Sequence, residues 1–208
     1  MKKFELTAEF VTNIFGKKLF RIKALVSFGN VNAGELGGFV EKEENLSNTG
    51  NAWVSGNALV YGNAKVSGDA RVYDDAWVYG DAWVYGNARV YGNALVSGDA
   101  WVYDNARVYG NALVSGNALV SGDAWVYDNA DYAVVEGFGR YFRATTFFRC
   151  KDKILRVQCG CFYGDLAEFR EIVKKTHKNN KYAKEYLAIA DLMELHFSDE
   201  EGRQEAAE

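Results

Sequence analysis

The amino-acid sequence predicts a mostly β protein organised around a repeat array. A six-residue phrase of the form Asn/Asp-Ala-x-Val-Tyr/Ser-Gly/Asp occurs fourteen times without insertion over residues 51–134. Alanine occupies the second position of all fourteen copies, and valine occupies the fourth position of the first thirteen. Self-similarity at a fixed period is typical of a repeat protein, in which each unit packs on its neighbours.

Each hexad predicts a short bent strand. Because residues six apart drift around a helix of 3.6 residues per turn, the repeat cannot form a helical stripe. The Ala-x-Val-Tyr order alternates with a period of two instead, and the following Gly-Asn supplies the bend. Three hexads close a triangular coil of eighteen residues, so the array makes between four and five coils with alanine and valine pointing inward.

The segment before the array predicts a β-hairpin and a linker, together residues 1–38. Two runs of β-forming residues, 4–11 and 19–25, flank a turn at Gly16. One imperfect coil, residues 39–50, then opens the repeat domain of residues 39–134, with Val40 and Leu46 in register with the later alanine column. Its charged residues suit a terminal cap, because an open coil end exposes backbone edges.

The segment after the array, residues 135–197, predicts an α+β cap or oligomerisation domain. Residues 140–150 and 154–159 are expected to pair as a β-hairpin. Asp165, with Glu168 three residues later, predicts the N-cap of a helix. A second helix is expected over about residues 182–197, and residues 198–208 are expected to form a mobile acidic tail.

Composition narrows the function classes. A net charge of -4 and a pI near 5.4 argue against a general polyanion binder, so nucleic acid is not an expected partner. The first residues are not followed by a long apolar segment, and no stretch approaches the ~20 apolar residues of a membrane span. We therefore expect a cytoplasmic protein without a membrane partner. Three cysteines confined to one segment fit a reducing compartment.

Sorting the outward positions by eighteen residues gives three faces of different chemistry. The first face carries the column Trp53, Arg71, Arg89, Arg107 and Trp125 beside the column Ser55, Tyr73, Tyr91, Tyr109 and Tyr127. The second face carries Leu59, Trp77, Leu95, Leu113 and Asp131 beside Tyr61, Tyr79, Ser97 and Ser115. The third face carries Lys65, Trp83, Trp101 and Leu119 beside Ser67, Tyr85, Tyr103 and Ser121. All five tryptophans are thereby predicted to lie outside the repeat core.

The first face is the candidate ligand-binding surface. Its arginine and tyrosine columns can bind an anionic or planar ligand through charge and stacking. The candidate binding residues are Arg71, Tyr73, Arg89, Tyr91, Arg107 and Tyr109. The alternative is that these side chains only stabilise neighbouring strands and pair with the corner residues Asp69, Asp74 and Asp75.

The second and third faces are the candidate interface. They carry apolar and aromatic residues of the types that dominate protein interfaces. The candidate interface residues are Trp77, Trp83, Trp101, Leu95, Leu113 and Leu119. They pack either against the terminal segments, or against a second copy of the chain in a homo-oligomer, or against a foreign partner.

No cofactor and no metal are expected. The weak candidates for a metal site are Cys150, Cys159, Cys161 and His177, because thiolates and imidazole suit zinc. The usual two-residue spacing between the cysteines is missing, which favours structural cysteines. A Cys/His nucleophile pair is an alternative that requires the fold to bring His177 to a cysteine.

The chain resembles the hexapeptide-repeat proteins common in phages and prophages. The resemblance depends on residues 33–47, on the Gly-Asn-Ala-x-Val array, and on residues 157–162, 176–177 and 180–186. It implies a left-handed parallel β-helix of about five triangular coils, and it transfers no catalytic residue. Left-handed β-helices include polymer-forming proteins and many acyltransferases, which typically have a catalytic histidine on or near the coils and an extruded loop. Here neither His177 nor His196 lies in the array, and no hexad is interrupted.

The sequence therefore predicts a nonenzymatic, phage-derived binding protein. We expect it to sequester or inhibit a host factor, as an anti-defence protein does, through the aromatic and arginine-bearing outer faces. The expected partner is a host protein or an anionic small molecule such as a nucleotide, in the cytoplasm of an infected or lysogenic bacterium. A structural self-assembling oligomer and a hexapeptide acyltransferase are the alternatives.

Overall fold

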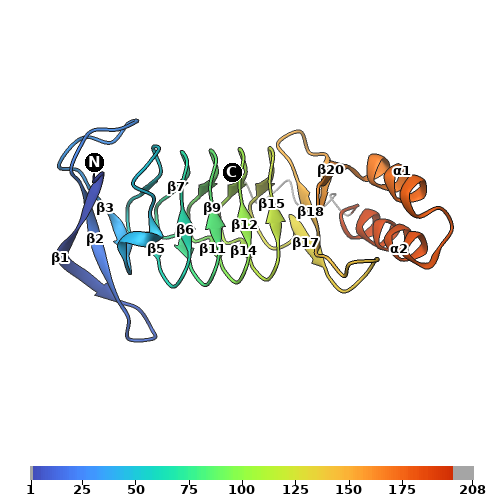
Figure 1. The fold of residues 1–208 in the computed structure, drawn as a ribbon, viewed down its shortest axis with the longest axis horizontal. Coiled ribbons are helices and arrows are strands. Elements are labelled where there is room, and N and C mark those ends of the chain that lie inside the picture. Colours follow the sequence, from blue (N-terminus) through green and yellow to red (C-terminus); the bar gives the residue numbers. More distant parts are fainter. Residues whose placement is uncertain (1, 199–208) are drawn as a thin grey trace. The chain divides into compact units, whose positions relative to one another are not determined.

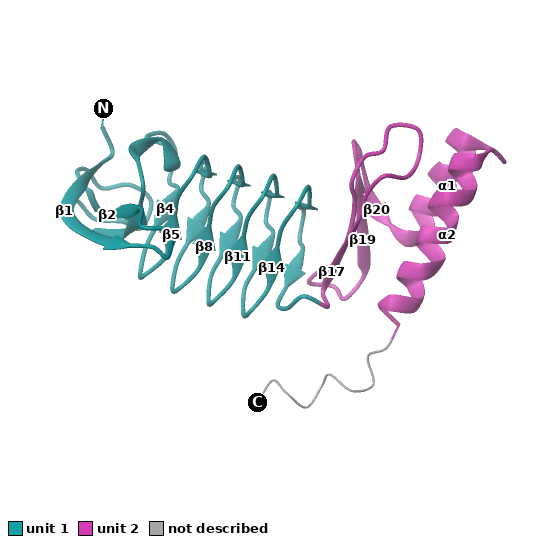
Figure 2. Ribbon diagram, turned by 90° about the horizontal axis from the view of Figure 1, so that it is seen from below, with its two compact units in different colours: residues 1–129 teal, residues 130–208 magenta. Residues whose placement is uncertain are grey.

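A computed structural model describes residues 2–198 of the chain (Figure 1). The chain divides into two compact units, residues 1–129 and residues 130–208, which Figure 2 shows in different colours. Of the helices in the described part of the chain, none combines the length and the apolar character that crossing a bilayer requires.

Unit 1 is a β-solenoid of about five turns, as the repeat predicts. Each of the thirteen hexads in residues 51–128 contributes one two-residue strand. These strands are β4 (Trp53–Val54), β5 (Leu59–Val60), β6 (Lys65–Val66), β7 (Arg71–Val72), β8 (Trp77–Val78), β9 (Trp83–Val84), β10 (Arg89–Val90), β11 (Leu95–Val96), β12 (Trp101–Val102), β13 (Arg107–Val108), β14 (Leu113–Val114), β15 (Leu119–Val120) and β16 (Trp125–Val126). They stack in parallel to give three sheets, and Figure 1 shows the successive coils side by side. The handedness of the coil stays a prediction.

The three sheets correspond to the three predicted faces. The first face is the sheet β4-β7-β10-β13-β16, the second contains β5, β8, β11 and β14, and the third is β6-β9-β12-β15. Between them, the alanine and valine columns from Ala52 to Val126 are buried, and nearly all of these residues have no exposed surface. Burial of apolar surface contributes about 25 cal/mol per Å², so the two inward columns supply the main stabilisation of the coils.

The corners of the coils explain the glycine at the sixth position of the hexad. Gly80 has a φ of +73°, and a Cβ placed on it would lie 3.0 Å from the backbone nitrogen of Gly98 in the next coil. Glycine avoids both the left-handed strain and the close contact. Asp74 and Asp104 occupy equivalent corners at φ values of 59° and 57°, a conformation that Asp tolerates better than most residues.

The N-terminal hairpin is present and extends the sheet of the second face. Its strands are β1 (Phe4–Thr12) and β2 (Lys18–Ala24), which pair antiparallel. β3 (Leu36–Val40) pairs antiparallel with β2 and parallel with β5, so the sheet contains seven strands. Part of the segment that the sequence predicts to be a linker is therefore a strand.

The register predicted for the first, imperfect coil is wrong. Val40 pairs with Val60, and Leu46 forms a bridge with Val66, so both side chains belong to the valine column instead of the alanine column. The offset is twenty residues in both cases, two more than a regular coil. The extra residues lie in the corner before β4, and the larger Val and Leu side chains match the larger column.

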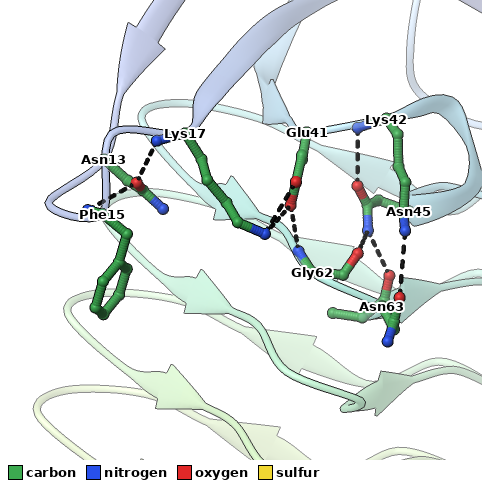
Figure 3. A network of polar contacts seen from close by, with 9 residues as sticks. Asn13, Phe15, Lys17, Glu41, Lys42, Asn45, Gly62 and Asn63 are labelled. Carbon is green, nitrogen blue, oxygen red and sulfur yellow. Dashed lines mark hydrogen bonds and ion pairs between the residues drawn. The ribbon is translucent and has the colours of Figure 1, made fainter.

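Polar contacts attach this first coil, which includes the 3-10 helix η1 (Glu43–Asn45), to the hairpin and to the repeats (Figure 3). Lys17 Nζ lies 3.1 Å from Glu41 Oε1, and the other oxygen of Glu41 accepts the backbone N–H of Gly62 at 2.6 Å. Asn45 Nδ2 donates to the carbonyls of Gly62 at 3.1 Å and Ala64 at 2.8 Å. These contacts satisfy backbone groups at the start of the solenoid, as a terminal cap requires.

Unit 2 contains a four-stranded antiparallel sheet and two helices. The sheet order is β17 (Tyr132–Val135), β18 (Thr145–Arg149), β19 (Leu155–Cys159) and β20 (Phe162–Asp165). Helices α1 (Leu166–His177) and α2 (Lys181–His196) follow, and their apolar residues share one core with the sheet. The N-cap prediction is confirmed, because Asp165 accepts the backbone N–H of Glu168 at 2.8 Å.

The sheet of unit 2 is wider than the predicted hairpin. The fourteenth hexad, which lacks valine at its fourth position, leaves the solenoid and supplies β17, which pairs with β18. Asp131, placed on the second face by its spacing, instead lies in unit 2, 3.5 Å from Arg149. The predicted acidic tail lies, apart from Ser198, outside the described residues.

Candidate functional site

The first face carries a continuous stack of tyrosine rings. The ring centroids of Tyr73 and Tyr91 lie 4.8 Å apart with planes 4° apart, and those of Tyr91 and Tyr109 lie 5.0 Å apart with planes 10° apart. Tyr127 follows at 5.2 Å but is tilted by 58°. The parallel strands therefore align three of the predicted binding residues in one ladder.

The arginine column runs beside this ladder. Strand pairing sets Arg89 directly between Arg71 and Arg107. Arg71 is half-buried and donates to the side-chain oxygen of Asn30, whereas the guanidinium of Arg107 lies 5.0 Å from the ring centroid of Trp125. Burial, followed by the charge of Arg89, lowers the pKa of Arg71. The column thus brings like charges together on neighbouring strands, which is unfavourable without a counter-charge.

The corner aspartates do not neutralise the arginines directly. Asp69 accepts from the backbone and side-chain nitrogens of Asn51 at 3.1 and 2.8 Å, and Asp75 accepts from Asn57 at 3.1 Å. Asp74 accepts the backbone N–H of Gly92 at 3.3 Å. In residues 2–198, no ion pair joins the three arginines of the column to a carboxylate. The predicted pairing of these arginines with Asp69, Asp74 and Asp75 is therefore wrong, because the aspartates bond between coils.

A hollow of about 560 Å³ lies at the start of the first face. It is lined by Gly29, Asn30, Asn51, Ser55, Asp69, Arg71, Tyr73, Asn87 and Arg89. Gly29 and Asn30 come from the loop after β2, which is closed by reciprocal backbone hydrogen bonds between Phe28 and Val31 at 3.0 and 2.8 Å. Three of the six candidate binding residues, Arg71, Tyr73 and Arg89, line this hollow, whereas Tyr91, Arg107 and Tyr109 lie further along the face.

Two more features of the N-terminal segment shape this region. Trp53 is only 2% exposed and packs against Phe28 with ring centroids 5.4 Å apart, so the N-terminal segment covers it. It pairs with Arg71 in the outward column and therefore lies outside the alanine and valine core, as predicted. Lys3 is 4% exposed, and its ammonium donates to the carbonyl of Ala52 at 2.9 Å. Burial, and then the charge of Arg71, lower the pKa of Lys3 to about 8.

Sequence reasoning missed Lys3, Gly29 and Asn30 as residues of this region. They precede the array, and the six-residue period says nothing about where the hairpin and its following loop pack. The signal that could have found them is the presence of Trp53 at an outward position of the first coil. A large apolar ring there needs a partner from a segment outside the repeat.

The third face stacks tryptophans instead of arginines. Trp83 and Trp101 have ring centroids 5.4 Å apart, and each is 40% exposed. Tyr85 and Tyr103 stack beside them at 5.0 Å, and Lys65 Nζ lies 5.1 Å from the ring centroid of Trp83.

The second face is partly covered by the hairpin. Tyr61 is 5% exposed and stacks on Tyr79 at 5.0 Å, and Leu19 of β2 joins their cluster. Among the predicted interface residues, Trp77 and Leu95 are half-buried and Leu113 is 41% exposed. Leu119 of the third face is half-buried.

The candidate residues for a metal site differ in their exposure to solvent and in their contacts. Cys150 is buried, Cys159 is half-buried and accepts from the Thr145 hydroxyl at 3.2 Å, and Cys161 is exposed. His177 lies with its ring centroid 5.7 Å from that of Tyr186. Burial, and then interaction with Cys159, raise the pKa of Tyr186 to about 12. Across residues 2–198, no group of three or more His, Cys, Asp and Glu side chains is arranged to hold a metal ion.

Comparison with known proteins supports the class that the fold defines. The chain is a β-solenoid repeat protein. Its repeats match the family model described as the YdcK Beta solenoid repeat over residues 64–80, 70–86, 82–98, 88–104, 100–116, 106–122 and 114–128. These overlapping matches cover residues 64–128, which is less than half of the 208-residue chain. No curated protein matches the chain.

Proposed function

We propose that the protein is a nonenzymatic binding protein that holds an anionic ligand on its first face. The observation that carries the proposal is the hollow of about 560 Å³ in which Arg71, Arg89 and Tyr73 converge. Pockets of about 300–1,000 Å³ are typical of small-molecule sites. A guanidinium binds phosphate or carboxylate through two parallel hydrogen bonds.

The hollow is lined by two guanidinium groups and one carboxylate, that of Asp69, so its net positive charge favours an anion. Arg89 is exposed, and its guanidinium makes no hydrogen bond or ion pair with another residue in the described part of the chain. Its charge acts on Arg71, which is half-buried and has a lowered pKa. An anion between the two guanidinium groups would offset their repulsion, a benefit that a purely structural role for the column does not supply.

The biological role that we propose is sequestration or inhibition of a host factor, as in an anti-defence protein. Its support is the resemblance of the sequence to hexapeptide-repeat proteins of phages and prophages. The ligand would then be an anionic molecule of the bacterial host, or an anionic group on a host protein, taken up in the cytoplasm.

A self-assembling oligomer is a second candidate, favoured by the third face. Trp83 and Trp101 form a stacked pair, and each ring is 40% exposed. Exposed aromatic side chains of this kind are common in interfaces. Sedimentation of the wild type and of Trp101→Ser over a range of concentrations tests this role, and a wild type that stays monomeric at high concentration contradicts it.

Anion binding is tested by calorimetric titration with inorganic pyrophosphate at low salt. We expect the wild type to bind and Arg89→Ala to bind at least fivefold more weakly, with affinity falling as salt rises because the attraction is screened. Lys65→Ala is the matched control, because it removes a cation of the third face. Absence of binding to the wild type, or an equal loss in Lys65→Ala, would contradict the proposed function.

A further inference from the structure

The tyrosine ladder of the first face ends where the hollow begins. One ring face of Tyr73 is covered by Tyr91. On its other side, strand β4 sets Ser55 abreast of Tyr73, because Trp53 pairs with Arg71 and Val54 with Val72. Ser55 has no ring, and both Ser55 and Tyr73 line the hollow. The position of the next ring in the ladder is therefore open space.

This open position has the spacing of an aromatic stack. Neighbouring strands lie about 4.8 Å apart. The rings of Tyr73 and Tyr91, on adjacent strands, lie in nearly parallel planes with centroids separated by 4.8 Å. A planar ring above Ser55 would meet Tyr73 in the same offset-stacked geometry that the protein uses between its own rings.

The charged groups define the rest of the ligand. Arg71 lies two residues before Tyr73, and Arg89 pairs with Arg71 on the next strand of the sheet; all three line the same hollow. Asn51 and Asn30 add polar side chains from the corner and from the loop after β2, and the carboxylate of Asp69, which also lines the hollow, accepts from Asn51. A matching ligand therefore joins one planar ring to one anionic group through a short polar spacer.

We propose that the hollow binds a nucleoside monophosphate. Its base stacks on Tyr73 in the ring position left open above Ser55, and its phosphate contacts Arg71 and Arg89. The inference rests on the proposed function, since it specifies which anion the first face holds. It assigns Tyr73 as the stacking platform and Ser55 as the residue whose small side chain keeps the position open.

The other tyrosine ladders have different surroundings. On the third face Ser67 precedes Tyr85 as Ser55 precedes Tyr73, but the hollow includes no residue of that face, and its outward column offers Trp83 and Trp101 instead of arginines. On the second face, Tyr61 is packed into a cluster with Leu19. A stacking position beside two guanidinium groups is thus specific to the first face.

The experiment fills the open position with the protein's own ring. Ser55→Tyr continues the ladder, so we expect the affinity for AMP, measured by calorimetry, to fall at least tenfold while the thermal midpoint does not decrease. Ser67→Tyr makes the same change before Tyr85 and should bind AMP as the wild type does. The wild type should also bind AMP roughly tenfold more tightly than ribose 5-phosphate, because stacking of a base adds about that factor.

The outcomes separate this inference from the proposed function. If AMP and ribose 5-phosphate bind equally, or Ser55→Tyr binds AMP like the wild type, or no AMP binds, the stacking inference is wrong, whereas Arg89-dependent pyrophosphate binding would leave the proposed function intact. If Ser55→Tyr does not fold, Tyr73→Ser removes the platform from the other side, with Tyr85→Ser as its control. Equal AMP affinity in these two variants overturns the inference as well.

Discussion

The first and third faces of the solenoid are built on the same scaffold and differ in their outer columns. Both carry stacked tyrosines, at 4.8 Å for Tyr73 and Tyr91 and at 5.0 Å for Tyr85 and Tyr103. Beside them, the third face has a stack of tryptophans and the first face has a column of arginines. The buried alanine and valine columns are common to both, so they fix the fold and leave the outer columns free to differ.

The difference between the two columns separates stabilisation from binding. Stacked tryptophans attract one another, so the pair on the third face stabilises its own strands. Three arginines on neighbouring strands repel one another, and they make no ion pair within residues 2–198. Arg71 bonds Asn30 and Arg107 lies over Trp125, so it is the guanidinium of Arg89, without such a contact in the described residues, that binding explains better than folding.

The largest expected effect is the same for both faces, because it comes from substitutions in the core that they share. Val90→Asp, on the first face, and Val84→Asp, on the third, each bury a carboxylate at a position with no exposed surface. We expect each to destabilise the protein by about 4 kcal/mol or more, since an unpaired charge cannot be accommodated there. Thermal unfolding followed by circular dichroism measures both. A large loss in only one variant would show that the two faces do not share one core.

The second prediction compares the ladders themselves. Tyr91 stacks on both sides, with Tyr73 and Tyr109, whereas Tyr103 makes one parallel stack, with Tyr85. Because an aromatic pair contributes about 0.5–1.5 kcal/mol, Tyr91→Ala should cost about 2 kcal/mol and Tyr103→Ala about 1 kcal/mol of unfolding free energy in urea. Equal losses in the two variants would mean that ring stacking does not determine the stability of these columns.

The solenoid could be predicted from the sequence, because Ala, Val and Gly recur at positions that only a stacked coil explains. The residues of the three faces followed from the same period. The end of the array could not be predicted in the same way: Val40 and Leu46 shift by two residues because a corner is longer, and the fourteenth hexad joins another sheet. The hollow depends on where Asn30 packs, and that contact with Arg71 comes from a segment outside the period.

The third prediction concerns the loop that closes the hollow on the first face. Asn30→Ala removes the acceptor of the Arg71 guanidinium, and the loss of one hydrogen bond costs about 1 kcal/mol. We expect faster hydrogen exchange at the amide of Val31, which is bonded to the Phe28 carbonyl at 2.8 Å, and a fall of at most about 2–4 °C in the global unfolding midpoint. Asn93→Ala, which removes a corner amide elsewhere, is the control. Unchanged exchange in Asn30→Ala would show that Arg71 does not hold this loop.

The smallest expected effect comes from Lys3, whose ammonium is buried near the first face. Its pKa is lowered from 10.5 to about 8 in the folded protein, first by burial and then by the charge of Arg71. Between about pH 8 and pH 10.5 the unfolded chain therefore holds more protons at Lys3 than the folded protein does. In this pH range the free energy of unfolding rises with pH, because folding no longer has to bury Lys3 in its charged form.

Lys3→Met and Lys3→Arg isolate this contribution. The methionine has no proton to lose, and the guanidinium stays protonated throughout the range, so neither variant should show the rise. The stability of the wild type relative to either variant should increase from pH 7.5 to pH 8.5 by under about 1 kcal/mol, or under about 2–4 °C in the thermal midpoint. A relative stability that is flat or falls over this range would mean that the Lys3 ammonium is hydrated in the folded protein, and that water reaches it between the Ala52 carbonyl and the Phe28 ring.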